Sequence, residues 1–355
     1  MRGWWWLWVR CPGLGAVRIT ALRCLSVAQG VGPDELWRWP IERLRQELTW
    51  PRSCAEGVER YRRLKGARPD LAVPSDSLLP GDLHWPESLN RLHRSPPVLH
   101  HRGRQDLWGL LQQRQAVAIV GTRSASEHGL AMADELGQAL AAAGWPVLSG
   151  LAEGIDAAAH RGCLAVNGAP VAVLGTPLDR VYPVHHKPLQ MAVGRRGLLL
   201  SEHAPGSAVR PGHFAARNRL LVLFAKALVV VECPERSGAL ISAAFAAEQQ
   251  CPVWAVPGDA RRWSCRGSNA LLEDQAAPLL RTEKLVQQLG AGPLIVKQGR
   301  PQHVLLEAIG DGASINELTE RLRMTPGQLA TQLLEMERSG HLQCDSGFLW
   351  KRRSP

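Results

Sequence analysis

Small-residue turns that follow short apolar runs are the features of this sequence best suited to chemistry. The first turn, Gly121-Thr122-Arg123, follows an apolar run at 116–120, and Ser149-Gly150 ends a second run. Later polar segments are Lys187, Arg217-Asn218-Arg219 and Ser237-Gly238. Free amides at helix starts and guanidinium groups hold phosphates, and such turns leave room for a base to stack. The pattern predicts a phosphate-bearing ligand.

No catalytic residue is predicted. The nucleophile-elbow pattern GxSxG and the Walker A pattern are both absent. Asp156 and His160 lie four apart on one predicted helix face, as an acid–base pair would, but a buried cap or helix-to-loop hydrogen bond is favoured. Glu202 and Glu232 follow predicted strands and could bond a sugar hydroxyl or hold the arginines of the RNR triplet. We favour the structural role for both.

The composition favours a polyanionic partner and gives no reason to expect a cofactor. Lys and Arg total 42 against 32 Asp and Glu, a net charge of +10. The first turn does not match GxGxxG, so a dinucleotide is not expected. The eight cysteines show no CxxC or zinc spacing, and the histidine pairs at 100–101 and 185–186 lack a suitably spaced carboxylate or cysteine. We therefore expect no metal and a reduced, cytoplasmic location.

The tryptophan-rich run at 4–9 is too short to span a bilayer, so no membrane association is expected. We interpret it as the first strip of a helical core. The competing interpretation is a platform on which bases stack.

Six apolar runs that alternate with helical segments predict the architecture that positions the turns. The runs lie at 117–120, 146–149, 171–174, 197–201, 227–231 and 252–256. Parallel strands buried on both faces have this appearance, and the result is an extended Rossmann-like, doubly wound parallel sheet in an α/β fold. Because ligands bind at the carboxyl ends of such strands, all the turns belong to one site. Residues 84–103 are expected to add an edge element.

Three domains are predicted, at 1–70, 71–290 and 300–355. The first is helical, of the helix-hairpin-helix or SAM-like kind, and its turn at 11–16 either approaches a phosphate or simply joins two helices. The last has helical patterns at 304–309, 314–322 and 325–340 and a hairpin at 341–351, which is typical of a winged helix. Arg338 is the only long cation of its recognition helix suited to reading bases. That scarcity favours protein interaction or an auxiliary role.

Seven motifs in register resemble the DprA/Smf family of DNA-processing proteins over about residues 80–282. The motifs are VAIVGTRSASEHG (117–129), SGLAEGIDAAAH (149–160), VAVLGTPLDRVYP (171–183), LLLSEHAPG (198–206), FAARNRLL (214–221), VVVECPERSGALISAAFAAE (229–248), and VWAVPGD (253–259) with GSNALL (267–272). No single motif is specific, but the set is.

The resemblance implies a non-enzymatic protein that binds and protects single-stranded DNA, forms a homodimer and helps load the recombinase RecA during natural transformation. It implies a DNA site made of Gly121, Thr122, Arg123, Ser149, Gly150, Lys187, Arg217, Asn218, Arg219, Ser237 and Gly238. Glu153, Pro177, Ala215 and Ser242 depart from the family pattern, and Glu153 would repel phosphate. The unusually basic stretch at 261–266 could add a contact.

Two other functions are open to this sequence. Related Rossmann-like proteins release a base from a nucleoside monophosphate, but they carry a PGGxGT loop, and residues 235–240 lack its glycine pair. A transcription regulator acting through the winged helix is disfavoured by that helix's few basic residues.

Overall fold

The computed structural model describes residues 1–92, 94–295, 305–306, 308–310, 312–322, 324, 326–338 and 342–352. It divides into two compact units, Met1–Leu294 and Ile295–Pro355, and each is described by itself. The finer division into domains at 1–70, 71–290 and 300–355 stays a prediction.

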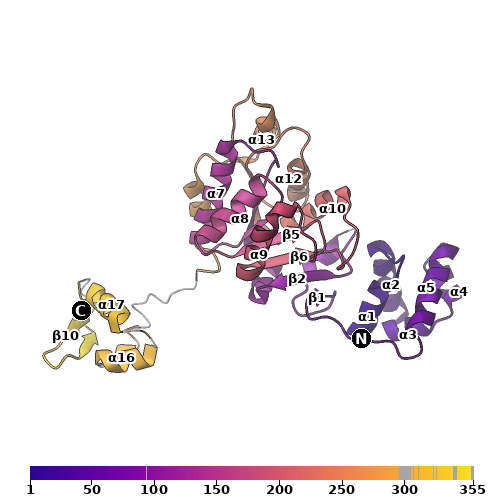
Figure 1. The fold of residues 1–355 in the computed structure, drawn as a ribbon, viewed down its shortest axis with the longest axis horizontal. Helices are drawn as coiled ribbons and strands as arrows, with labels where there is room; N and C mark the ends of the chain where they lie inside the picture. Colours follow the sequence, from indigo (N-terminus) through magenta and orange to yellow (C-terminus); the bar gives the residue numbers. More distant parts are fainter. Residues whose placement is uncertain are drawn as a thin grey trace. The chain divides into compact units, whose positions relative to one another are not determined.

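A nine-stranded sheet organises the described part of the first unit (Figure 1), in the order β1-β2-β6-β5-β4-β3-β7-β8-β9. Its strands are β1 (Ser77–Leu78), β2 (Leu99–Gly103), β3 (Ala116–Val120), β4 (Val147–Ser149), β5 (Pro170–Leu174), β6 (Leu198–Ser201), β7 (Ala225–Val230), β8 (Val253–Ala255) and β9 (Ala277–Pro278). From β6 to β9 all neighbours are parallel, whereas β1 and β2 pair antiparallel at one edge. The six predicted strands are confirmed. The segment at 84–103 adds β2 to the sheet beside β6, and β1, from before that segment, is the outermost strand.

Helices cover both faces of the sheet, which confirms the doubly wound prediction. Alternate residues of β3 divide between two cores. Val117 and Ile119 pack against α7 (Glu127–Ala142) and α8 (Ile155–Ala165), while Ala118 and Val120 pack with the apolar residues of α11 (Asn218–Phe224) and α12 (Gly238–Glu248). The helices of this region are α6 (Trp108–Gln112), α7 (Glu127–Ala142), α8 (Ile155–Ala165), α9 (Lys187–Arg196), α10 (Pro211–Ala216), α11 (Asn218–Phe224), α12 (Gly238–Glu248), α13 (Arg266–Glu273) and α14 (Thr282–Leu289). Because the central strands are buried on both sides, their sequences are continuous apolar runs.

Short helices form a separate core at the amino-terminal end of this unit. They are α1 (Arg2–Val9), α2 (Ala16–Gln29), α3 (Pro33–Arg38), α4 (Ile41–Glu47) and α5 (Arg52–Lys65). Trp6 and Trp8 are buried, and the Trp8 indole N–H donates to the carbonyl of Pro33 at 2.9 Å. The tryptophan run is therefore core, as predicted. A phosphate-binding role for the turn between α1 and α2 stays a prediction.

The second unit has a small core of its own. Its elements are α16 (Ile315–Leu322), α17 (Pro326–Arg338) and an antiparallel pair, β10 (Leu342–Cys344) with β11 (Trp350–Arg352). Ser314 and Glu317 exchange side-chain to backbone hydrogen bonds at the start of α16, which makes a capping box. Thr325, the first residue of the helix predicted at 325–340, and parts of the helix predicted at 304–309 lie outside the described residues. The winged-helix assignment stays a prediction.

Candidate nucleic-acid interface

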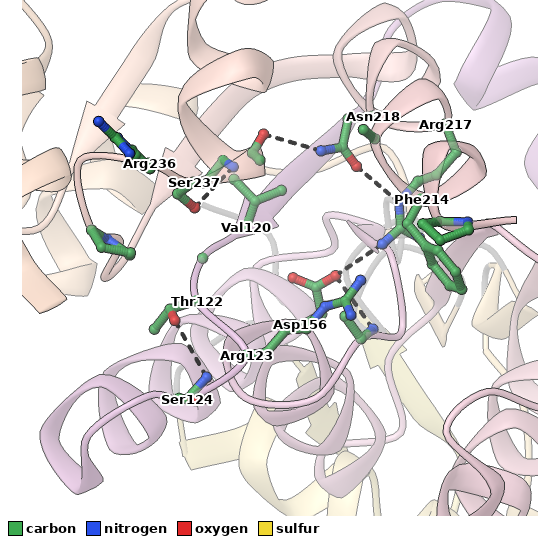
Figure 2. Close-up of a pocket in the computed structure, with 17 residues that line it drawn as sticks. Val120, Thr122, Arg123, Ser124, Asp156, Phe214, Arg217, Asn218, Arg236 and Ser237 are labelled. Carbon is green, nitrogen blue, oxygen red and sulfur yellow. Dashed lines mark hydrogen bonds and ion pairs between the residues drawn. The ribbon is translucent and has the colours of Figure 1, made fainter.

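A hollow of about 400 Å³ lies where the carboxyl ends of β3 and β7 meet the helices that follow. Figure 2 shows the residues around it. They come from the turn after β3, the loop after β4, α10 and the α10–α11 junction, and the start of α12. The lining residues are Val120, Gly121, Thr122, Arg123, Ser124, Ala152, Asp156, Pro211, Phe214, Ala215, Arg217, Asn218, Pro234, Arg236, Ser237, Gly238 and Ala239. Several turns far apart in sequence therefore share one site, at the sheet edge where ligands are expected.

Glu232 holds the turn after β3 through hydrogen bonds to its backbone and to Ser126. Its carboxylate oxygen Oε2 accepts bonds from the Ser126 amide (3.1 Å) and hydroxyl (2.7 Å), and its carbonyl accepts from the Thr122 amide (2.7 Å). A Cβ at Gly121 would lie 2.5 Å from Ile155 Cγ1, so only glycine fits at the start of the turn. Glu232 is structural, but in another way than predicted: its hydrogen bonds hold this turn, and no arginine of the RNR triplet pairs with it among the described residues.

Arg123 is the exposed cation of the same turn. Its guanidinium carbon lies 5.2 Å from the centre of the Phe214 ring, a cation–π contact that directs the side chain along the wall of the hollow. Among the described residues, no ion pair to a carboxylate occupies it. Its charge is therefore available to an anionic ligand.

The opening turn of α12 supplies amide donors on another side of the hollow. Ser237 caps the helix by accepting from the Ala239 amide at 3.2 Å, and the Asn218 side chain donates to the carbonyl of Gly238 at 3.2 Å. Free amides in the first turn and the helix dipole favour an anion there. Exposed Arg236 stands immediately before this cap. The hollow is thus positive on two sides.

Arg217 has a different environment from Arg123, because its side chain is 5% exposed and fully engaged. It donates to the carbonyls of Gly150 and Val173, and its Nη2 lies 3.4 Å from Asp156 Oδ2. Burial raises the pKa of Asp156, and the Arg217 guanidinium opposes that shift. A Cβ at Gly150 would sit 1.8 Å from Arg217 Nη2. Arg217 thus ties together the loop after β4, β5 and the α10–α11 junction.

The buried helix face at Asp156 and His160 confirms the structural interpretation of Asp156. This carboxylate accepts from the amides of Gly150 (3.1 Å) and Ala152 (3.4 Å). His160 is fully buried, and burial, helped by the Arg217 charge, lowers its pKa to about 3. A neutral, enclosed imidazole beside a tied carboxylate is not placed to exchange protons with a ligand.

The hollow brings together seven of the predicted site residues: Gly121, Thr122, Arg123, Arg217, Asn218, Ser237 and Gly238. Ser149 is buried and donates to the Ile119 carbonyl at 2.6 Å, while Gly150 borders a small adjoining hollow. Arg219 pairs with Glu202 at 2.6 Å, which confirms the structural role predicted for that carboxylate. Lys187 is exposed at the start of α9, in a separate hollow of about 340 Å³.

Among the lining residues outside the predicted site, Arg236 and Phe214 have the side chains best suited to contact a ligand. Arg236 directly precedes Ser237-Gly238, and a cation between a strand and a helix start is a signal that could have identified it. Phe214 lies three residues before Arg217 and has no polar group to mark it. Its ring centre lies 5.0 Å from that of Tyr182, so the two rings border the adjoining hollow.

Glu153 is exposed at the rim of the adjoining hollow, with its Oε1 3.3 Å from His185 Nε2. Groups of three or more potential metal ligands are absent from the described residues. Within that same part of the chain, the helices are too short or too polar to cross a membrane.

Comparison with known proteins identifies the family. Residues 76–290 match the family described as DNA recombination-mediator protein A. Protein Smf of Synechocystis is 40% identical over 228 residues, which are 64% of this chain and 57% of that protein. The chain therefore spans little more than half of that relative's length. DNA processing protein DprA of Streptococcus pneumoniae is 35% identical over 65% of this chain and 80% of its own length.

Solved structures agree with the sequence comparison. The structure of DprA from Streptococcus pneumoniae matches with a TM-score of 0.67 and 27% identity, over 81% of this chain and 98% of that one. DNA processing protein A from Helicobacter pylori, whose structure describes a single-stranded DNA binding mode, matches with a TM-score of 0.52 and 28% identity, over 58% and 92% of the two chains. The resemblance inferred from the motifs is confirmed: the chain belongs to the DprA/Smf family of DNA recombination mediators.

Proposed function

We propose that this chain binds single-stranded DNA in the hollow at the carboxyl edge of its sheet and does not transform it chemically. One observation carries the proposal: Arg123 is exposed, has no carboxylate partner among the described residues, and lines the same hollow as the amino-terminal turn of α12. Guanidinium groups and free amides are the donors that phosphates bind. The single-stranded DNA binding described for the Helicobacter pylori relative supports this choice of ligand.

The aromatic wall of the hollow accounts for a preference for single strands. Phe214 lines the hollow, and Tyr182, 51% exposed, stands beside it. Only an unpaired base can present its face to such rings. In this proposal Arg123, Arg236 and the Ser237-Gly238 amides hold phosphates, with Gly121, Thr122 and Asn218 shaping the surface.

The remaining predicted residues have supporting roles in this proposal. Arg217, with Ser149 and Gly150, holds the loops in place, and Arg219 is occupied by Glu202. Lys187 would touch the strand only beyond the hollow. We extend the proposal to a homodimer that protects incoming single strands and helps load RecA in the cytoplasm, on the basis of family membership.

Release of a base from a nucleoside monophosphate is the less favoured function. Hydrolysis of that kind needs a free carboxylate or another general acid or base beside the sugar. Asp156 is the one carboxylate among the lining residues, and Arg217 and two backbone amides already hold it.

Binding to matched oligonucleotides tests the proposal. Fluorescence anisotropy with labelled single- and double-stranded DNA of one sequence is expected to show tighter binding of the single strand, weakened by salt. Incubation with nucleoside monophosphates is expected to leave them intact. Equal affinity for both DNA forms, or release of free base, would overturn the proposal.

A further inference from the structure

The loop between β8 and α13 exposes an aromatic side chain among cations. Trp263 is 64% exposed, and Arg261, Arg262 and Arg266 around it are exposed too. All thirteen tryptophans lie in the described residues, and the other twelve are buried or partly buried. An exposed indole among exposed arginines offers a flat face on which a base can stack, beside cations that bind phosphates.

Hydrogen bonds pin the base of this loop. The Asn269 side chain accepts from the Gly258 amide at 3.0 Å and donates to the Gly258 carbonyl at 3.1 Å. At the tip, the Arg262 amide donates to the Asp259 carbonyl at 3.0 Å, and the Arg261 amide donates to the Asp259 carboxylate at 2.8 Å. The basic side chains are therefore presented by a defined turn, which lowers the entropy cost of binding.

The loop adjoins the hollow described above. Strand β8 is the parallel neighbour of β7, so the loops after both strands leave the same edge of the sheet. The amides of Gly267 and Ser268 donate to the Cys233 carbonyl at 2.8 and 3.2 Å, which joins the start of α13 to the loop after β7. That loop continues through Pro234 and Arg236, which line the hollow. In Figure 1 the chain before α13 projects from this region.

We propose that Arg261, Arg262, Trp263 and Arg266 form a second subsite for single-stranded nucleic acid. The DNA strand would leave the hollow beside Arg236. One of its bases would stack on the Trp263 indole, and its phosphates would bind the arginines. The one carboxylate of the segment 259–266, Asp259, accepts a backbone amide, whereas the same segment exposes three arginines. This inference rests on the proposed function and lengthens the site that the function requires.

An acidic protein surface would also bind arginines, but two observations favour nucleic acid. The exposed indole offers a flat face suited to a base, and the subsite continues directly from a phosphate-type hollow. Binding to a protein partner is left as an outcome of the test.

The test compares variants on thymidine oligonucleotides of increasing length, measured by anisotropy competition. Trp263→Ala is expected to bind the shortest oligonucleotides like wild type and the longer ones roughly 5- to 150-fold more weakly, the range for a lost base stack. Trp263→Phe is expected to restore most of that affinity. Because Trp263 is exposed, neither change should impair folding.

A double arginine variant supplies a matched electrostatic measurement. On long single strands, log affinity falls as log salt rises, and Arg261→Ala/Arg262→Ala is expected to make that negative slope shallower by about 1.4. This is about 0.7 for each lost phosphate contact. The control is Arg195→Ala/Arg196→Ala, two adjacent exposed arginines at the end of α9, just before β6, which lies on the other side of the central strand β3 from β8. Its slope is expected to match wild type.

Several outcomes would overturn the subsite. One is affinity of Trp263→Ala equal to wild type at every length, as a protein-binding role would give. Another is a loss that is the same at all lengths, which would place Trp263 within the hollow. If Arg123→Ala binds normally while Trp263→Ala fails only on long strands, the subsite stands and the proposed hollow falls. The reverse result leaves the hollow and removes the subsite.

Discussion

Two arginines at one sheet edge differ in almost everything except type. Arg123, in the turn after β3, is exposed and its guanidinium contacts the Phe214 ring, and no carboxylate of the described residues pairs with it. Arg217, at the α10–α11 junction, is buried, paired with Asp156 and bonded to two carbonyls. A buried arginine whose guanidinium is held by protein acceptors organises the site. An exposed arginine without a carboxylate partner among the described residues is available to a ligand. The comparison predicts that one residue governs stability and the other affinity.

The largest expected effect is on folding, from Arg217→Ala. The change leaves the Asp156 carboxylate buried without its partner, which costs about 3–5 kcal/mol of unfolding free energy. Denaturant-induced unfolding measures it, with Arg195→Ala as an exposed-arginine control expected to stay within about 0.5 kcal/mol of wild type. The double variant Arg217→Ala/Asp156→Ala should be less destabilised than the sum of the two single ones. A loss below 1 kcal/mol in Arg217→Ala would erase the contrast between the two arginines.

The buried side of the comparison also predicts a pH dependence, through His160. Its pKa is about 3 in the folded chain and about 6.5 when unfolded, because of burial and the Arg217 charge. Between these values the unfolded state binds a proton that the folded state does not, so this contribution to stability is complete above pH 6.5 and is lost toward pH 3. The loss amounts to about 5 kcal/mol at most. Unfolding measured across this pH range should give a flatter profile for His160→Leu, and an identical profile would contradict the assignment.

On the exposed side, Arg123→Ala is expected to weaken single-strand binding by about 1.5–3 kcal/mol, the value of a charge-assisted phosphate contact. Its unfolding free energy should stay within about 0.5 kcal/mol of wild type, because the side chain is exposed. Anisotropy and denaturation on the same preparation separate the two readouts. A destabilised Arg123→Ala would show that this residue, too, is structural.

The smallest expected effect comes from Glu153, the carboxylate at the rim. Glu153→Gln removes an exposed negative charge near the phosphate path and should tighten single-strand binding by about 0.2–1 kcal/mol at low salt, and less at high salt. Titrations at two salt concentrations measure it. Weaker binding by this variant would mean that the Glu153–His185 pair orders the rim.

The strands were predictable because parallel strands buried on both faces leave uninterrupted apolar runs. The turns were predictable too, since glycine is needed where backbones approach closely, as at Gly121. Whether Arg123 or Arg217 would be buried and paired was not predictable from the sequence. Arg217 meets Asp156 across 61 residues of sequence, and no local pattern records that partner. Glu202 was expected to hold the arginines of the RNR triplet, Arg217 and Arg219, and it pairs with Arg219.

The sequence analysis also missed a site residue whose sequence neighbours carry no motif for its role. Phe214 acquires its role only when α10 brings it beside Arg123 and Tyr182. Lys187 was expected with the other cations, but α9 places it in a different hollow. Side-chain position at the end of a long loop depends on tertiary packing, which the sequence pattern does not encode.

The most direct test of the central claim is the salt dependence of single-strand affinity for wild type and Arg123→Ala, measured side by side. If Arg123 holds a phosphate, its removal lowers the affinity and reduces the slope of log affinity against log salt by about 0.7. An unchanged slope and affinity would contradict the claim that the hollow after β3 is the DNA site.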